Sequence, residues 1–134
     1  MRPASIIYFE RLSVLSILVG IAFTMLTWDA EVKVAQASNL GSAFVPLVQG
    51  ISLFIILLLI FLISRKASNI AKWILVALFV LGVAFIAPSL LQTLDQGLIG
   101  LLQLSQLIVQ AAAIYFLFTP EARAWFGARG RPAT

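Results

Sequence analysis

Residues 43–63 read AFVPLVQGISLFIILLLIFLI, a stretch with no charged side chain. A helix of about 20 apolar residues spans the roughly 30 Å hydrocarbon core of a bilayer. Lipid offers no partners for backbone N–H and C=O groups, so a segment that crosses it must be a helix or a strand of a closed barrel. Barrel strands alternate in polarity and this stretch does not, so it predicts a transmembrane helix.

Three more segments of this kind occur, at about residues 12–28, 70–87 and 97–118. The chain has 134 residues, of which 62% are hydrophobic and 10% charged, whereas soluble domains carry about 25% charged residues. We therefore expect an all-α polytopic membrane protein. Residues 1–134 would form one domain, a bundle of four transmembrane helices built as two antiparallel hairpins.

The connection between the third and fourth spans is ambiguous in the sequence. Pro88 is expected to end the third helix because proline removes a helical hydrogen bond. The fourth helix then begins either at Ser89, as a capping residue, or after Gly97. The sequence does not decide between these two starting points.

Basic residues gather on one side of the predicted membrane. Eight of the nine flank the chain ends and the link between spans two and three, and only Lys33 lies in a connection on the other side. Cytoplasmic flanks of membrane proteins are enriched in Lys and Arg. We predict a multi-pass protein with both termini in the cytoplasm. The alternative, a signal peptide cleaved near Ala35 to Ala37, is disfavoured because the first apolar stretch is longer than signal peptides have.

The C-terminal segment after the fourth span has signals of a short helix. Thr119 can cap it, Pro120 suits its first turn, and Glu121 suits the positive end of its dipole. We predict an interfacial helix over residues 120–126 and a disordered tail over 128–134. The segment serves either as a membrane-surface anchor, which we favour, or as a docking segment for a partner.

Two polar stripes run along predicted helices. Gln92, Gln96, Gln103, Gln106 and Gln110 would share one face of the fourth helix, and Ser13, Ser16, Gly20, Thr24 and Thr27 share one face of the first. Amides and hydroxyls hydrogen-bond across helices, and small residues let helices approach closely. The preferred interpretation is a packing seam between these helices. The alternative is a polar path that lines a ligand. The candidate residues for the seam or for the path are Gln103, Gln106, Gln110, Ser16 and Thr24, and Gln49 could join either.

Glu10 is the acidic side chain that comes closest to the membrane interior from the side of the termini. It could pair across the bundle with Arg65, Lys66 or Lys72. A charge near the hydrocarbon is costly unless it is paired. We take Glu10 and Arg65 as a candidate ion pair at the cytoplasmic edge.

Residue types that are missing narrow the chemistry. The chain has no Cys and no His, which removes thiol chemistry, histidine acid–base catalysis and the usual ligands of haem, iron–sulfur clusters and zinc. We expect no enzyme activity, no cofactor and no metal. Nucleic-acid binding is not expected, because lipid headgroups and membrane topology account for the basic residues.

Both ends of the chain resemble a group of known proteins. The motifs are RPASI at residues 2–6, FE at 9–10, WD at 28–29 and YFLFTPEARAWF at 115–126. In these the chain is similar to uncharacterised small four-helix proteins of the bacterial inner membrane. The resemblance implies their topology and location, and no activity. We expect an accessory or structural subunit, acting as a homodimer or in a larger membrane complex. The alternative is a small dimeric transporter or channel that uses the glutamine face.

Overall fold

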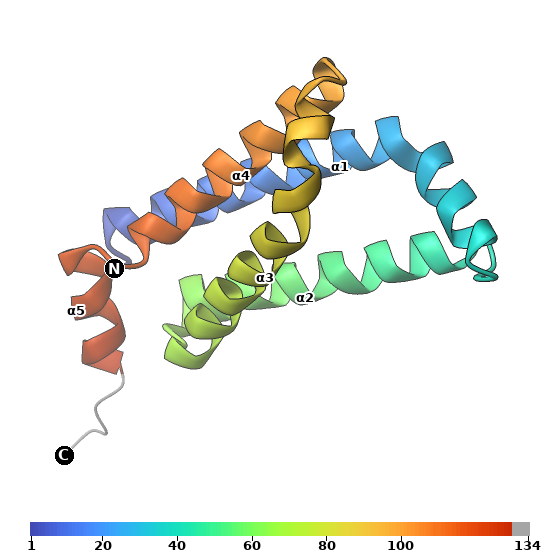
Figure 1. Ribbon diagram of the computed structural model, residues 1–134. Coiled ribbons are helices and arrows are strands. Elements are labelled where there is room, and N and C mark those ends of the chain that lie inside the picture. Colours follow the sequence, from blue (N-terminus) through green and yellow to red (C-terminus); the bar gives the residue numbers. More distant parts are fainter. Residues whose placement is uncertain (130–134) are drawn as a thin grey trace.

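Five helices follow one another in the computed structural model, which describes residues 1–129 (Figure 1). Four of them are long and apolar enough to cross a membrane, as the sequence predicts. The prediction of an all-α bundle is confirmed, and the described residues contain no strand. The helices are α1 (Ala4–Ala37), α2 (Phe44–Lys66), α3 (Asn69–Leu94), α4 (Leu98–Phe116) and α5 (Pro120–Arg129).

The bundle is packed at one end and splayed at the other (Figure 1). We call the end that carries the N-terminus, α5 and the α2–α3 turn the closed end, and the end with the other two connections the open end. The most extensive helix contact is between α1 and α4. The α3 helix runs diagonally, leaving α2 at the closed end and reaching α4 at the open end (Figure 1).

A compact apolar core lies at the closed end. Ile6 and Phe9 of α1 are fully buried there, together with Ile63 of α2, Leu75 of α3 and Leu117 just after α4. Between membrane helices, lipid tails are as apolar as leucine, so this core stabilises the bundle through van der Waals packing rather than escape from water. The helices are therefore held in register from the closed end.

The tight turn between α2 and α3 keeps these two helices together at the closed end. Ala67 ends α2 in the left-handed conformation with φ 50°, and the N–H of Ser68 donates to the carbonyl of Leu62 at 3.1 Å. The Ser68 hydroxyl then caps α3 by accepting from the N–H of Ala71 at 3.2 Å. One pair of residues thus completes both helix ends.

Two helices extend further than the sequence predicts. The first does not end at Trp28 but continues to Ala37, and the third runs through Pro88 to Leu94. Pro88 cannot donate a helical hydrogen bond, but membrane helices tolerate proline in their interior. The α3 helix continues through Pro88 without a break, and beside it the Ser89 hydroxyl donates to the carbonyl of Ile86 at 3.1 Å. The α4 helix begins at Leu98, which selects the later of the two predicted starting points.

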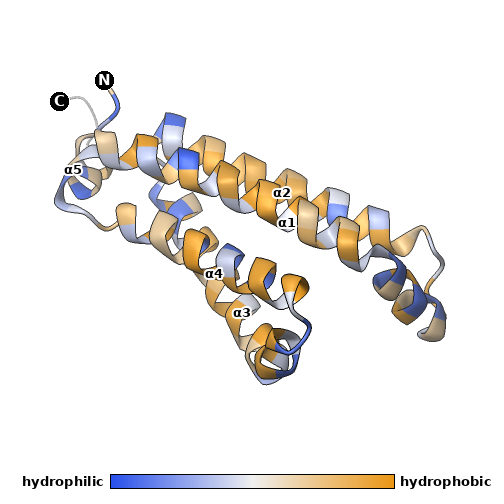
Figure 2. Ribbon diagram, turned by 90° about the horizontal axis from the view of Figure 1, so that it is seen from above, coloured by the Kyte–Doolittle hydropathy of each residue, from blue (hydrophilic) through white to orange (hydrophobic). Residues whose placement is uncertain are grey.

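The α5 helix turns across the closed end, and polar residues gather there and at the α1–α2 connection (Figure 2). Thr119 caps it as predicted, accepting from the N–H of Ala122 at 3.4 Å. The helix continues beyond residue 126, where it was predicted to end, and runs to Arg129. The prediction of disorder is therefore wrong for residues 128–129, and residues 130–134 lie outside the described part of the chain.

The α3–α4 connection depends on a glycine that no larger residue can replace without movement. A Cβ atom added to Gly100 would lie 2.3 Å from the carbonyl oxygen of Thr93 and 2.7 Å from the Cα of Leu94. Both atoms are backbone, so the start of α4 would have to move away from the end of α3. The close approach fixes the direction in which α4 leaves the turn.

We predict that Gly100→Ala destabilises the protein by about 2 kcal/mol, because overpacking forces backbone shifts. Gly82→Ala is the matched control, since a Cβ at Gly82 meets nothing within 4 Å, and alanine favours a helix by about 1 kcal/mol over glycine. Thermal unfolding in detergent, followed by circular dichroism, measures both. Equal melting temperatures for Gly100→Ala and wild type would contradict the tight approach.

Candidate functional site

The polar stripe of α1 meets α4 directly. Ser13 and Ser16 are 1% and 3% exposed, and Gly20 faces Gln106. A Cβ at Gly20 would lie 2.6 Å from Gln106 Nε2, so a larger residue at this position would require the amide end of Gln106 to move. The two stripes that the sequence shows on helices one and four thus lie against each other.

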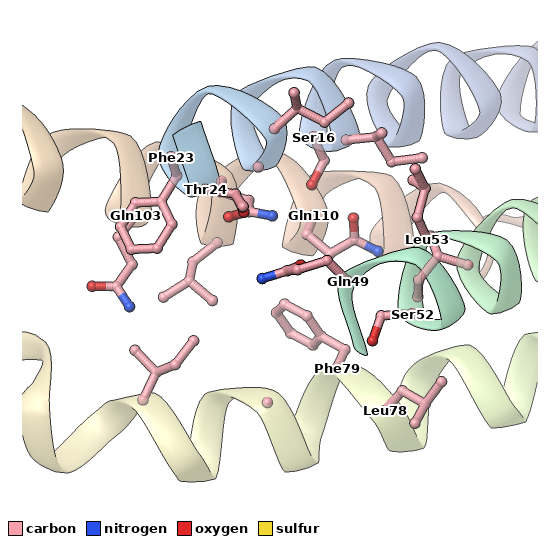
Figure 3. Close-up of a pocket in the computed structure, with 18 of the residues that line it drawn as sticks. Ser16, Phe23, Thr24, Gln49, Ser52, Leu53, Leu78, Phe79, Gln103 and Gln110 are labelled. Carbon is pink, nitrogen blue, oxygen red and sulfur yellow. The ribbon is translucent and has the colours of Figure 1, made fainter. Parts of the chain in front are cut away.

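A cavity of about 640 Å³ lies between α1, α2, α3 and α4. Its polar lining comes mainly from α1 and α4, with contributions from α2, and its other wall is the apolar face of α3. In Figure 3 the side chains of Gln49, Gln103 and Gln110 lie on one side of this space, opposite Leu78 and Phe79 of α3. The polar residues that line it are Ser16, Thr24, Glu31, Gln49, Ser52, Gln103, Gln106 and Gln110.

All five residues that the sequence proposes for the polar seam line this cavity: Ser16, Thr24, Gln103, Gln106 and Gln110. The longer glutamine ladder was wrong in part. Gln92 belongs to α3 and Gln96 to the turn before α4, so the five amides do not share one helix face. The error has the same cause as the misplaced end of the third helix, which was expected to stop at Pro88.

One amide in the cavity wall has an unused hydrogen-bonding atom. The Oε1 atom of Gln103 is buried and has no hydrogen-bond partner in the described part of the chain. Burying an amide without a partner costs about 1–3 kcal/mol on protein mutational scales.

The sequence interpretation missed the carboxylate at the open end of the cavity. Glu31 lines it, and its Oε2 atom accepts a hydrogen bond from Gln49 Nε2 of α2 at 3.0 Å. The signal was present in the sequence: Glu31 follows Thr27 by four residues and so continues the polar stripe of α1. It was overlooked because the helix was expected to end at Trp28.

The candidate ion pair at the closed end is present but lies away from the cavity. Glu10 Oε1 is 3.8 Å from Arg65 Nη2, and the other carboxylate oxygen of Glu10 pairs with Arg2. Neither Glu10 nor Arg65 lines the cavity. The pair therefore joins α1 to α2 and the N-terminal segment.

Aromatic rings and α5 cover the closed end. The Nζ atom of Lys72 is 4.7 Å from the ring centre of Phe126 and 5.0 Å from that of Phe118, within the range of cation–π attraction. Arg129 Nη1 donates to the carbonyl of Arg65 at 3.0 Å. The α5 helix thus contacts the last turn of α2 and the first turn of α3.

The side chains that line the cavity can bind a ligand by hydrogen bonds and by charge. Its lining has amides, hydroxyls and one carboxylate, with no Lys, Arg, His or Cys beside them. The described residues contain no group of three acidic side chains suited to a metal ion. Comparisons with protein-family models, with curated proteins and with solved structures found no match to this chain.

We predict that Gly20→Leu destabilises the bundle by about 1–3 kcal/mol, because the leucine must displace the Gln106 amide from the α1–α4 contact. In a Gln106→Ala background the same change should cost at least about 1 kcal/mol less, since the space is then free. A double-mutant cycle on thermal unfolding in detergent measures this coupling. Additive effects of the two substitutions would show that the contact is not close.

Proposed function

We propose that this protein is a membrane-embedded binding protein for a small amphiphilic molecule, which it holds in the cavity between its four long helices. The observation that carries the proposal is the cavity itself: about 640 Å³, with polar groups from α1, α2 and α4 in a largely apolar lining, to which α3 adds only apolar side chains and Gly82. Ligand sites in proteins have volumes of about 300–1,000 Å³ and few convergent polar groups. The proposed function is ligand binding. If the site opened to both faces of the membrane in turn, the protein would act as a carrier.

The two sides of the cavity favour a molecule that is polar on one side and apolar on the other. Gln103 and Gln110 bring amide donors and acceptors to the cavity lining at membrane depth. Opposite them, α3 presents the apolar side chains of Leu78, Phe79 and Val83. An entirely apolar guest would leave the amides unpaired, and an entirely polar one would gain nothing from α3.

The cavity supports both interpretations of the glutamine face, packing and ligand lining, for different residues of α4. Gln106 packs against Gly20, as the packing interpretation requires. Gln103 and Gln110 line a space that belongs to one chain. The binding proposal therefore needs no second copy of the protein, in contrast to a route formed only between two protomers.

An accessory or structural role in a larger membrane complex or a homodimer is the second candidate. It is favoured by α3, whose buried residues, Ala71, Lys72 and Leu75, all lie near its start. Beyond them the helix exposes large apolar side chains such as Phe85 and Leu91, at 84% and 77%. Lipid covers such a surface, and so would a helix of a partner. A stoichiometric membrane complex in a pull-down from mild detergent would support this role.

We place the protein in the bacterial inner membrane with both termini in the cytoplasm, as the distribution of basic residues favours. The chain has no cysteine, so single cysteines report topology cleanly. We predict that Lys33→Cys is labelled by a membrane-impermeant maleimide in intact spheroplasts, and that Lys66→Cys is labelled only after lysis. The reverse pattern would invert the orientation.

The binding proposal predicts that filling the cavity abolishes binding. Gly82 lines it, a Cβ there meets nothing within 4 Å, and Gly82→Leu would occupy part of the space. The probe is N-phenyl-1-naphthylamine, a neutral dye that fluoresces in apolar sites, titrated into protein in maltoside micelles against a protein-free blank. We expect saturable binding by wild type and a loss of about tenfold or more in Gly82→Leu, which is about 1.4 kcal/mol.

Gly41→Leu is the matched control, because Gly41 also has open space around it but lies outside the cavity lining. It should bind the dye as wild type does. Equal binding by Gly82→Leu and wild type, or no saturable binding by wild type, would contradict the proposal. The accessory role would then become the leading candidate.

A further inference from the structure

The cavity lining carries negative charge and no positive charge. Among residues 1–129, Glu31 is the only charged residue that lines it. No Lys or Arg nitrogen of residues 1–129 lies within 4.0 Å of its carboxylate. In a cavity with apolar walls, a single uncompensated charge is felt more strongly than at a water-exposed surface.

Neighbouring side chains orient this carboxylate without neutralising it. Gln49 Nε2 donates to Oε2 at 3.0 Å. The Thr27 hydroxyl lies 3.0 Å from Oε1 and also 3.0 Å from the carbonyl oxygen of Phe23. A hydroxyl has one proton, so it serves one of these acceptors at a time, whereas a carboxylate offers about four acceptor positions. Acceptor positions on Glu31 therefore remain for a ligand.

One aromatic side chain shares the helix face of the carboxylate. Trp28 precedes Glu31 by three residues on α1, and both residues line the cavity. Phe23 also lines the cavity, about two helix turns from Glu31. Faces of aromatic rings attract cations, and tryptophan does so most strongly. A carboxylate and a tryptophan on one face of a cavity are a combination that recognises an organic cation.

We propose that the ligand of this cavity is a lipophilic organic cation, with its charged centre at Glu31 and Trp28 and its apolar body against α3. The inference rests on the binding function proposed above and adds the charge of the ligand. The cation would enter at the open end, where Glu31 lies. A zwitterionic phospholipid also carries an ammonium group, but its phosphate would find no Lys or Arg in the lining. A free cation is therefore favoured over a lipid headgroup.

The test uses two probes of matched size and opposite charge, tetraphenylphosphonium and tetraphenylborate. Equilibrium binding to the full-length protein is measured in maltoside micelles, with protein-free micelles as the blank. We expect wild type to bind the cation and not the anion. Glu31→Gln keeps the size of the side chain and an acceptor for Gln49, and should weaken binding of the cation about tenfold or more.

Asp29→Asn is the control variant, because it removes an acid of the same helix that does not line the cavity. It should bind the cation as wild type does. The neutral dye N-phenyl-1-naphthylamine separates the two proposals. If wild type binds the dye but prefers no charge, or if Glu31→Gln binds the cation as well as wild type, the inference is wrong and the binding function stands. If wild type binds neither the cation nor the neutral dye, both the binding function and the inference about the charge of the ligand are wrong.

Competition identifies the source of the ammonium group. Added phosphatidylethanolamine should leave binding of tetraphenylphosphonium unchanged if the ligand is a free cation. Displacement by this lipid in wild type, and its absence with phosphatidylglycerol, would assign the site to a phospholipid headgroup and overturn the proposed ligand class.

Discussion

The contact between α1 and α4, the most extensive between any two helices of the described chain, is the one on which the rest of the bundle depends. Because α4 lies along α1, and α2 returns from the far end of α1, α3 has to connect two helices that are apart. It leaves α2 through the tight turn at Ala67 and reaches α4 through the tight approach at Gly100. A helix so constrained at both ends runs diagonally (Figure 1). The cavity lies between this diagonal helix and the other three.

Lipid makes polar residues decisive for such an arrangement. Apolar side chains gain little by leaving hydrocarbon for a helix interface, whereas an amide facing lipid lacks hydrogen-bond partners. The glutamines of α4 must therefore face α1 or the space beside it. One face carries out both tasks: Gln106 packs against Gly20, and Gln103 and Gln110 border the cavity. The packing and site interpretations of this face thus describe neighbouring turns of one helix.

Much of this arrangement could be predicted from sequence because its signals are local or periodic. The four apolar segments, the stripes on helices one and four and the cap at Thr119 needed only residue type and spacing. The failures came from helix ends. The sequence predicts that the first span ends at Trp28, whereas α1 continues without a break to Ala37. Because the predicted helix ended at Trp28, Glu31 was left out of the polar stripe of α1, to which it belongs.

The Pro88 error came from applying a rule of soluble helices to a membrane helix. Proline ends most helices of soluble proteins, but membrane helices tolerate it in their interior, and α3 continues through Pro88 to Leu94. The cavity could not be predicted for a further reason. Its existence depends on the angle of α3, which follows from the two turns and from Gly100, where the decisive distances join residues of two different helices. No periodicity of a single segment encodes such an angle.

The distribution of charge gives the two ends of the bundle different roles. At the closed end, Arg65 lies near Glu10, and the ammonium of Lys72 lies near aromatic rings. A cation approaching there meets like charges and a packed core. At the open end, Glu31 faces a cavity that contains no basic residue. The packed core at the closed end and the carboxylate of Glu31 at the open end thus both favour entry of a positively charged molecule at the open end. Its apolar part would then contact α3.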